Sequence, residues 1–138
     1  MKLEVNQQVA AFVPYTDNDH EWLVSTLVSF DDNVCTVKDE EPEAGFENEN
    51  HWTIPRRHCI PLASSEEELK DLCGSALSIG DDVLALWHLD GSLWTSVFYE
   101  ATLFSLCTDG KNVLVRYSGE DVVRVVPYTK LLKKPQSS

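Results

Sequence analysis

The sequence predicts an all-β protein made of two small, strongly bent barrels that a short helix joins. Apolar side chains alternate with period two along most of the chain, and strand-favouring Val, Thr, Phe, Tyr and Trp supply many of them. Turn-forming pairs such as Asp90-Gly91 and Asp109-Gly110 separate the alternating segments. The pattern of the first half also recurs in the second half, which indicates a duplication.

Eight segments have the alternation expected of strands. They are Gln8–Val13, Glu21–Phe30, Val34–Asp39, His51–Pro55, Asp82–His88, Val97–Ser105, Val113–Tyr117 and Asp121–Pro127. One segment differs: SSEEELKDLCG, Ser64–Gly74, begins with serines that can cap, continues with glutamates and ends on glycine. These start and stop signals predict a short helix.

The duplication is visible in two pairs of segments. VNQQVAAF at Val5–Phe12 matches IGDDVLAL at Ile79–Leu86, and TIPRRHCIPL at Thr53–Leu62 matches VVPYTKLLK from Val125. Four to five short strands in each copy have too little core for a sandwich, which favours a barrel. We therefore expect a first barrel over residues 1–63, a helical linker over 64–76, a second barrel over 77–135 and a tail over 136–138.

Charge limits the class of ligand. The 138 residues include 23 acidic and 11 basic side chains, which gives a formal net charge of -12. Such a field repels phosphate backbones, so we expect no direct nucleic-acid ligand. It attracts basic peptides, more strongly at low salt.

The cysteines and histidines predict neither a metal site nor an enzyme. Cys35, Cys59, Cys73 and Cys107 form no closely spaced pair, and His58 beside Cys59 has no second such pair to complete a zinc site. No histidine has a recognisable nucleophile or carboxylate partner in the sequence, and no glycine-rich phosphate loop occurs. We expect a non-enzymatic protein without cofactors.

We also expect a soluble, intracellular protein with reduced thiols. The sequence shows no signal peptide, and no apolar run approaches the ~20 residues that cross a bilayer.

Aromatic residues crowd the segment WHLDGSLWTSVFY, where Trp87, Trp94 and Tyr99 surround an expected turn. Aromatic rings usually belong to a core, and packing between the two halves is the alternative reading. Rings beside a solvent-exposed turn are instead available to contact a ligand. A trimethylated ammonium group has no N–H to donate, and each aromatic face within ~6 Å of it contributes about 0.5 to 2 kcal/mol. Tyr117, which ends the next strand before Ser118-Gly119, can complete such a cage.

An acidic run, VKDEEPEAGFENEN at Val37–Asn50, is the second candidate site. Its outer part reads equally well as a solvated loop. Asp39 and Glu41, however, are two residues apart, so both point to one face if the strand continues. Two carboxylates on one face can hold a free α-amino group, which stays cationic near neutral pH.

These residues lie in a pattern that resembles a known family. VNQQVAAFVPYTDNDHEWLVSTLVSF, HWTIPRRHCIPL, DDVLALW and FYEAT together resemble the tandem Tudor domain of the SAGA-associated factor family, a histone-reading subunit of the SAGA acetyltransferase complex. The resemblance covers nearly the whole chain. It implies two packed SH3-like Tudor barrels in a nuclear protein that binds the N-terminal tail of histone H3. It also implies a di- or trimethylated lysine at the fourth position of that tail and other subunits of a SAGA-type complex as partners.

The resemblance also assigns the cage. VLALW puts Trp87 at the first cage position, FYEAT puts Tyr99 at the second and VRYSGED puts Tyr117 at the third. Trp87 stands in place of a tyrosine, and Tyr117 in place of a phenylalanine. The spacing between Trp87 and Tyr99 is longer than in the family, and counting with the shorter loop leads to Trp94. Trp94 is therefore a fourth wall or a replacement for Tyr99.

The acidic pair is assigned in the same way. TVKDEE aligns Asp39 and Glu41 with the family's pair that captures the free amino terminus of histone H3. Glu41 stands in place of an aspartate, and Glu40 can share its role.

Two other functions stay open at this point. A Tudor module could read methylarginine or another methyllysine through the cage alone, and a scaffold would read no mark. A peptide with a blocked amino terminus distinguishes the first of these functions from a reader of the histone end, because only the end reader should lose most of its affinity for that peptide.

Overall fold

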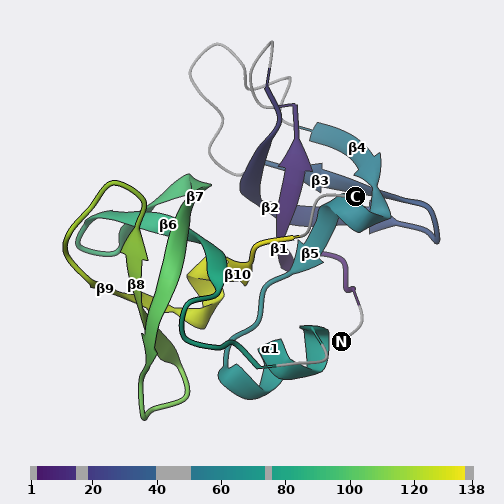
Figure 1. Ribbon diagram of the computed structural model, residues 1–138. Helices are drawn as coiled ribbons and strands as arrows, with labels where there is room; N and C mark the ends of the chain where they lie inside the picture. Colours follow the sequence, from purple (N-terminus) through teal and green to yellow (C-terminus); the bar gives the residue numbers. More distant parts are fainter. Residues whose placement is uncertain (1–2, 15–18, 40–50, 74–75, 136–138) are drawn as a thin grey trace. The chain divides into compact units, whose positions relative to one another are not determined.

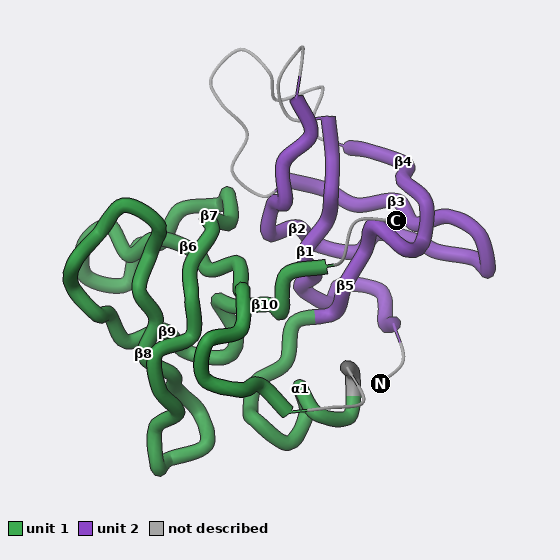
Figure 2. Tube along the Cα trace, viewed as in Figure 1, with its two compact units in different colours: residues 1, 62–138 green, residues 2–61 purple. Residues whose placement is uncertain are grey.

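The computed structural model describes residues 3–14, 19–39, 51–73 and 76–135, which form antiparallel strands and one short α-helix (Figure 1). The prediction of a mostly β protein with one helix is confirmed. The chain divides into two compact units, Lys2–Pro61 and Leu62–Ser138 (Figure 2). The finer boundaries, with the helix as a separate linker, stay a prediction.

The two units have the same strand order. The first contains β1 (Gln8–Val13), β2 (Glu21–Phe30), β3 (Val34–Lys38), β4 (His51–Pro55) and β5 (Cys59–Pro61), paired as β5-β1-β2-β3-β4. The second contains β6 (Asp82–Asp90), β7 (Leu93–Leu106), β8 (Asn112–Tyr117), β9 (Arg124–Pro127) and β10 (Leu131–Lys133), paired as β10-β6-β7-β8-β9. In each unit the fifth strand pairs with the first.

A short 3-10 turn makes each sheet curl. The turn is η2 (Arg56–His58) in the first unit and η3 (Tyr128–Lys130) in the second, and it joins the two strands that lie at opposite ends of the sheet order. In a flat sheet these strands would be about 19 Å apart, at ~4.8 Å per step. A 3-10 turn rises only about 2 Å per residue, so three residues cannot span that distance. Each sheet must therefore bend back on itself, as a small barrel does.

The pairing register confirms the duplication. Val9 pairs with Pro61 in the first unit, and Val83 pairs with Lys133 in the second. These pairs reproduce the two sequence matches, one on the first strand and one on the last. The second and third strands also have a register shift at the same place in both units, after Leu27 and after Leu103.

The turn between the second and third strands is the same in both units as well. The Asp31 carboxylate accepts hydrogen bonds from the backbone N–H groups of Asn33 and Val34, at 2.7 and 2.9 Å. The Asp109 carboxylate accepts from the N–H groups of Lys111 and Asn112 at 2.8 and 3.0 Å. Aspartate is suited to such turns because its short side chain reaches its own backbone.

The structure corrects several expected boundaries. The strands Cys59–Pro61 and Leu131–Lys133 are too short for the alternation pattern to reveal. The turn expected between Trp87 and Tyr99 is present but shorter than predicted: Trp87, Trp94 and Tyr99 all lie inside β6 and β7, and Gly91-Ser92 form the tip.

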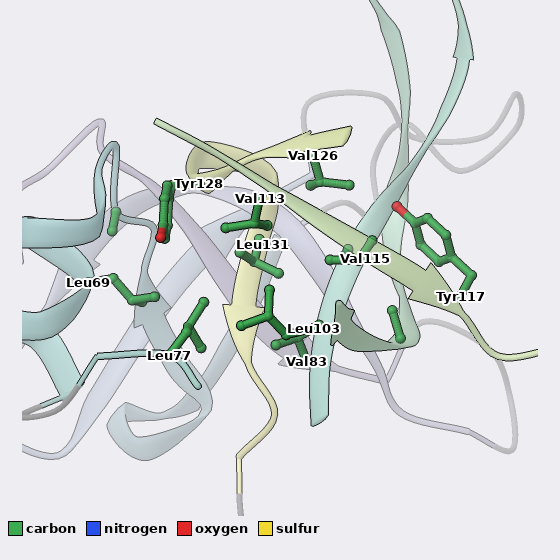
Figure 3. Packing of buried hydrophobic residues seen from close by; sticks show 13 residues of the cluster. Leu69, Leu77, Val83, Leu103, Val113, Val115, Tyr117, Val126, Tyr128 and Leu131 are labelled. Carbon is green, nitrogen blue, oxygen red and sulfur yellow. The ribbon is translucent and has the colours of Figure 1, made fainter. Parts of the chain in front are cut away.

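The second unit has a contiguous apolar core (Figure 3). The helix α1 (Glu66–Cys73) contributes Leu69 to it, so the helix packs with this sheet. The predicted cap is present: the Glu68 backbone N–H donates to Ser65 Oγ at 3.2 Å, and the Glu68 carboxylate accepts from the Ser64 N–H at 2.6 Å. Figure 3 shows Leu69 and Leu77 at one end of this core and Tyr117 at the other.

Candidate functional site

The three proposed cage residues of the second unit share one face of its sheet. Tyr99 pairs with Ala85, and Tyr117 pairs with Ala101, whose neighbours Val83 and Leu103 belong to the buried core. Cross-strand partners, and residues two apart on a strand, point to the same face. Trp87 follows Ala85 by two residues, so all three side chains leave their strands on the core side.

Trp87 and Tyr117 are in contact. Their ring centroids are 4.9 Å apart, and the rings meet at 64°, edge to face. The Tyr117 hydroxyl donates a hydrogen bond to the backbone carbonyl of Leu86, on the strand that carries Trp87. Trp87 is half-buried and packs against the core.

Tyr117 is more deeply buried than its position beside a turn suggests. Only 4% of it is exposed. Burial raises the pKa of its hydroxyl to about 12, so the ring is neutral at physiological pH. The ring is therefore fixed in position by packing and by one hydrogen bond.

Trp94 and Tyr99 occupy different environments. Trp94 is half-buried, packs against the core and lies 4.8 Å from the His88 ring, its cross-strand neighbour. Tyr99 is 47% exposed, and among the described rings it makes no contact with Trp87 or Tyr117. The cage role predicted for Tyr99 or Trp94 therefore stays a prediction.

A threonine that the sequence analysis did not single out supports Trp87. The Trp87 backbone N–H donates to Thr95 Oγ1 at 2.9 Å, and that hydroxyl donates to the Val97 carbonyl at 2.9 Å. This happens where the β6–β7 register shifts, between Leu86 and His88. The side chain thus satisfies a backbone donor next to the register shift.

An arginine also belongs to this group of side chains. Arg124 Cζ lies 4.6 Å from the Trp87 ring centroid, within cation–π range. Glu120 holds the guanidinium with two hydrogen bonds, Nε to Oε1 at 2.9 Å and a terminal nitrogen to Oε2 at 3.1 Å. The hydrogen bond from Arg124 lowers the pKa of the Glu120 carboxyl. The spacing of an acid and a base four residues apart in GEDVVR was the available sequence signal.

The acidic candidate site of the first unit is only partly described. Asp39 directly follows β3 and is buried, with 3% of the residue exposed. Glu40 and Glu41 lie outside the described residues. In the same unit, Arg56 donates to the Asp31 carbonyl at 2.9 Å and lies 3.9 Å from the Asp32 carboxylate.

Across the described part of the chain, no three His, Cys, Asp or Glu side chains are grouped as metal ligands. No described helix is long and apolar enough to span a bilayer. Cys35 and Cys59 are free and buried, and burial raises the pKa of the Cys59 thiol to about 12. Such a thiol stays protonated and is a poor nucleophile.

A comparison with protein-family models agrees with this architecture. The sequence matches the SGF29 tudor-like domain family over residues 5–133. Among solved structures, the chain is similar to the SHH1 SAWADEE domain of Arabidopsis thaliana, with 11% identity and a TM-score of 0.38, over 98% of this chain and 100% of that chain. It is likewise similar to the SHH1 SAWADEE domain in complex with an H3K9me3 peptide, with 12% identity and a TM-score of 0.38, over 97% and 100% of the two chains. No curated protein sequence gives a significant match.

Proposed function

Because the chain belongs to the SGF29 tudor-like family, a non-catalytic module, we propose that it reads the N-terminal tail of histone H3 methylated at its fourth residue. The second unit holds the di- or trimethylated lysine in an aromatic cage, and the first unit holds the free amino terminus. Because two sites of the protein bind one short peptide, they select both the methylated lysine and its distance from the amino terminus of the peptide.

The observation that carries this proposal is the cation already bound by Trp87. The guanidinium of Arg124 lies over that ring at 4.6 Å, beside the edge-on ring of Tyr117. A ring that attracts one delocalised cation also suits a methylated ammonium, because both lack a tightly held water shell. Trp87 and Tyr117 are the two principal walls, and Tyr99 or Trp94 supplies a further one.

The acidic end of the site depends on Asp39. An α-amino group offers three N–H donors and a positive charge, which a carboxylate complements directly. Asp39 already makes an interaction in the free protein, and its carboxylate can accept further hydrogen bonds from an ammonium. Glu41, or Glu40 in its place, provides the second carboxylate.

We place this reader in the nucleus, as one subunit of a SAGA-type histone acetyltransferase complex, with no nucleic acid or membrane as direct ligand. The net charge of -12 supports a basic histone tail as the partner. The same field disfavours direct contact with DNA, so the chain would reach chromatin through the tail.

The test is a titration followed by tryptophan fluorescence with four H3 N-terminal peptides. They combine a free or acetylated amino end with a trimethylated or unmodified fourth lysine. The trimethylated, free-ended peptide should bind with a dissociation constant in the micromolar range, about 7 to 8 kcal/mol of binding free energy, and each blocked feature should weaken it. Equal binding of all four peptides would refute the proposal and leave the methylarginine or scaffold functions.

A further inference from the structure

Arg124 occupies the same side of the second sheet as the cage residues. It pairs with Val115 across β8 and β9, and Val115 is fully buried in the core. Tyr117 follows Val115 by two residues and so points the same way. Arg124 therefore leaves β9 toward the rings, and its guanidinium meets the Trp87 face on the core side of the sheet.

The guanidinium is also anchored there. Glu120 holds it at 2.9 and 3.1 Å in a bidentate pair, the geometry that orients an arginine most firmly. Its side chain is nevertheless 42% exposed, so solvent reaches it. An exposed ion pair contributes little to stability, so it can open at small cost.

We infer that Arg124 is a tethered competitor of the ligand: its guanidinium fills the cation site on Trp87 in the free protein and must leave before a methylated ammonium enters. This inference rests on the proposed cage and adds that Arg124 sets the affinity of that cage for a methylated ammonium. Two cations on one ring face would repel each other, so the arginine and the ligand exclude one another there.

The competition has a defined consequence for specificity. A closed site lowers the apparent affinity of every ligand that enters it by the fraction of open molecules. The apparent affinity of a trimethylated peptide, which enters the cage, is reduced by this whole factor. The affinity of an unmodified peptide depends mainly on its amino terminus and is reduced much less. Removal of Arg124 should therefore tighten the methylated peptide and increase the preference for it.

The experiment compares the wild-type protein with Arg124→Ala and Arg124→Gln. Arg116→Ala is the matched control. Arg116 is exposed on β8 and pairs with Thr102, so its substitution removes one positive charge at a position away from Trp87. The ligands are tetramethylammonium chloride, which tests the cation site alone, and the four H3 peptides. Thermal unfolding of each variant verifies that the fold is retained.

We expect both Arg124 variants to bind tetramethylammonium and the trimethylated peptide about fivefold more tightly, which corresponds to a closed form in roughly four fifths of the molecules. The unmodified peptide and the Arg116 variant should stay within twofold of wild type. Unchanged or weaker binding by both Arg124 variants would overturn the inference, as would equal tightening by Arg116→Ala. Tighter tetramethylammonium binding without any H3 binding would uphold the competitor and refute the proposed histone ligand.

Discussion

The two units share a strand order but differ at the side chains that we propose to contact a ligand. Counting along the matched strands, Trp87 and Tyr99 of the second unit correspond to Val13 and Leu23 of the first, because Ala85 pairs with Tyr99 as Ala11 pairs with Leu23. Val13 and Leu23 are fully buried. The same end of the sheet is therefore filled by aliphatic side chains in one copy and lined by aromatic rings in the other.

At the third pair of equivalent positions, each unit has one residue of its proposed site. Lys38 pairs with Thr26, and Arg116 pairs with Thr102, so Asp39 and Tyr117 follow at the same place in the two copies. Both residues are buried. The same position thus holds a buried carboxylate in one unit and a buried aromatic ring in the other, and these are residues that we propose to bind the amino terminus and the methyllysine.

The first unit has aromatic residues as well, but they are elsewhere. Phe12 lies 5.1 Å from Trp22, 5.2 Å from His20 and 5.4 Å from His58, measured between ring centroids. Phe12 precedes Val13, so it points to the opposite face of the strand. Its counterpart in the second unit is Leu86, which is buried. The aromatic cluster of the first unit therefore lies on the opposite face of its strand from the position that corresponds to Trp87.

The largest expected effect comes from Trp87→Ala. Loss of this ring should abolish the preference for trimethylated over unmodified peptide, a change of about tenfold or more when one strong aromatic face is removed. Trp22→Ala, in the first unit, is the control and should keep the preference. Peptide titration by calorimetry measures both, and undiminished discrimination by Trp87→Ala would remove Trp87 from the cage.

The acidic position should behave differently. Asp39→Asn keeps the shape of the side chain but removes its charge, so it should weaken trimethylated and unmodified peptides alike, by about tenfold for a charge-assisted bond. Asp32→Asn changes the same charge on an exposed turn and should have little effect. If Asp39→Asn affected only the methylated peptide, the division of roles between the two units would be wrong.

Tyr117→Phe separates the ring from its hydroxyl. The cage needs only the ring, so methyllysine discrimination should survive. The lost hydrogen bond to the Leu86 carbonyl should lower the free energy of unfolding by about 1 kcal/mol. Urea denaturation measures this, with the exposed Tyr99→Phe as the control that leaves stability unchanged. Loss of discrimination in Tyr117→Phe would mean that the hydroxyl contacts the ligand.

The smallest effect is a pH dependence specific to the first unit. Burial lowers the pKa of His58, and Arg57 and His20 lower it further. The unfolded chain binds a proton at the ordinary pKa of about 6.5, so protonation favours unfolding. This contribution to stability is complete above that pH and is lost as pH falls through the lower pKa of the folded state.

Thermal unfolding between neutral and mildly acidic pH should therefore show a steeper decline for the wild type than for His58→Gln. Identical slopes for the wild type and His58→Gln would contradict the assignment.

Much of this fold could be predicted because strand alternation, turn residues and repetition are local or periodic signals. The helix cap at Ser64 and Ser65 was readable for the same reason. The strands β5 and β10 were missed because three residues carry too little periodicity, and the length of the β6–β7 hairpin was missed because Thr95 replaces a backbone partner at a register shift.

Within the candidate site, the sequence indicated Trp87 and Tyr117 together, and their contact is now visible at 4.9 Å. Arg124 was not anticipated. The spacing in GEDVVR signals its ion pair with Glu120 but not its contact with Trp87, which arises because β9 and β6 come together when the sheet curls.

The most direct test of a two-unit reader is to move the mark along the tail. Free-ended H3 peptides with a single trimethyllysine at the third, fourth or fifth position keep both recognised groups and change only the distance between them. Calorimetry should give the tightest binding at the fourth position and at least roughly tenfold weaker binding at the other two, where one group must be released. Equal affinity for all three peptides would show that the two units do not hold one peptide together.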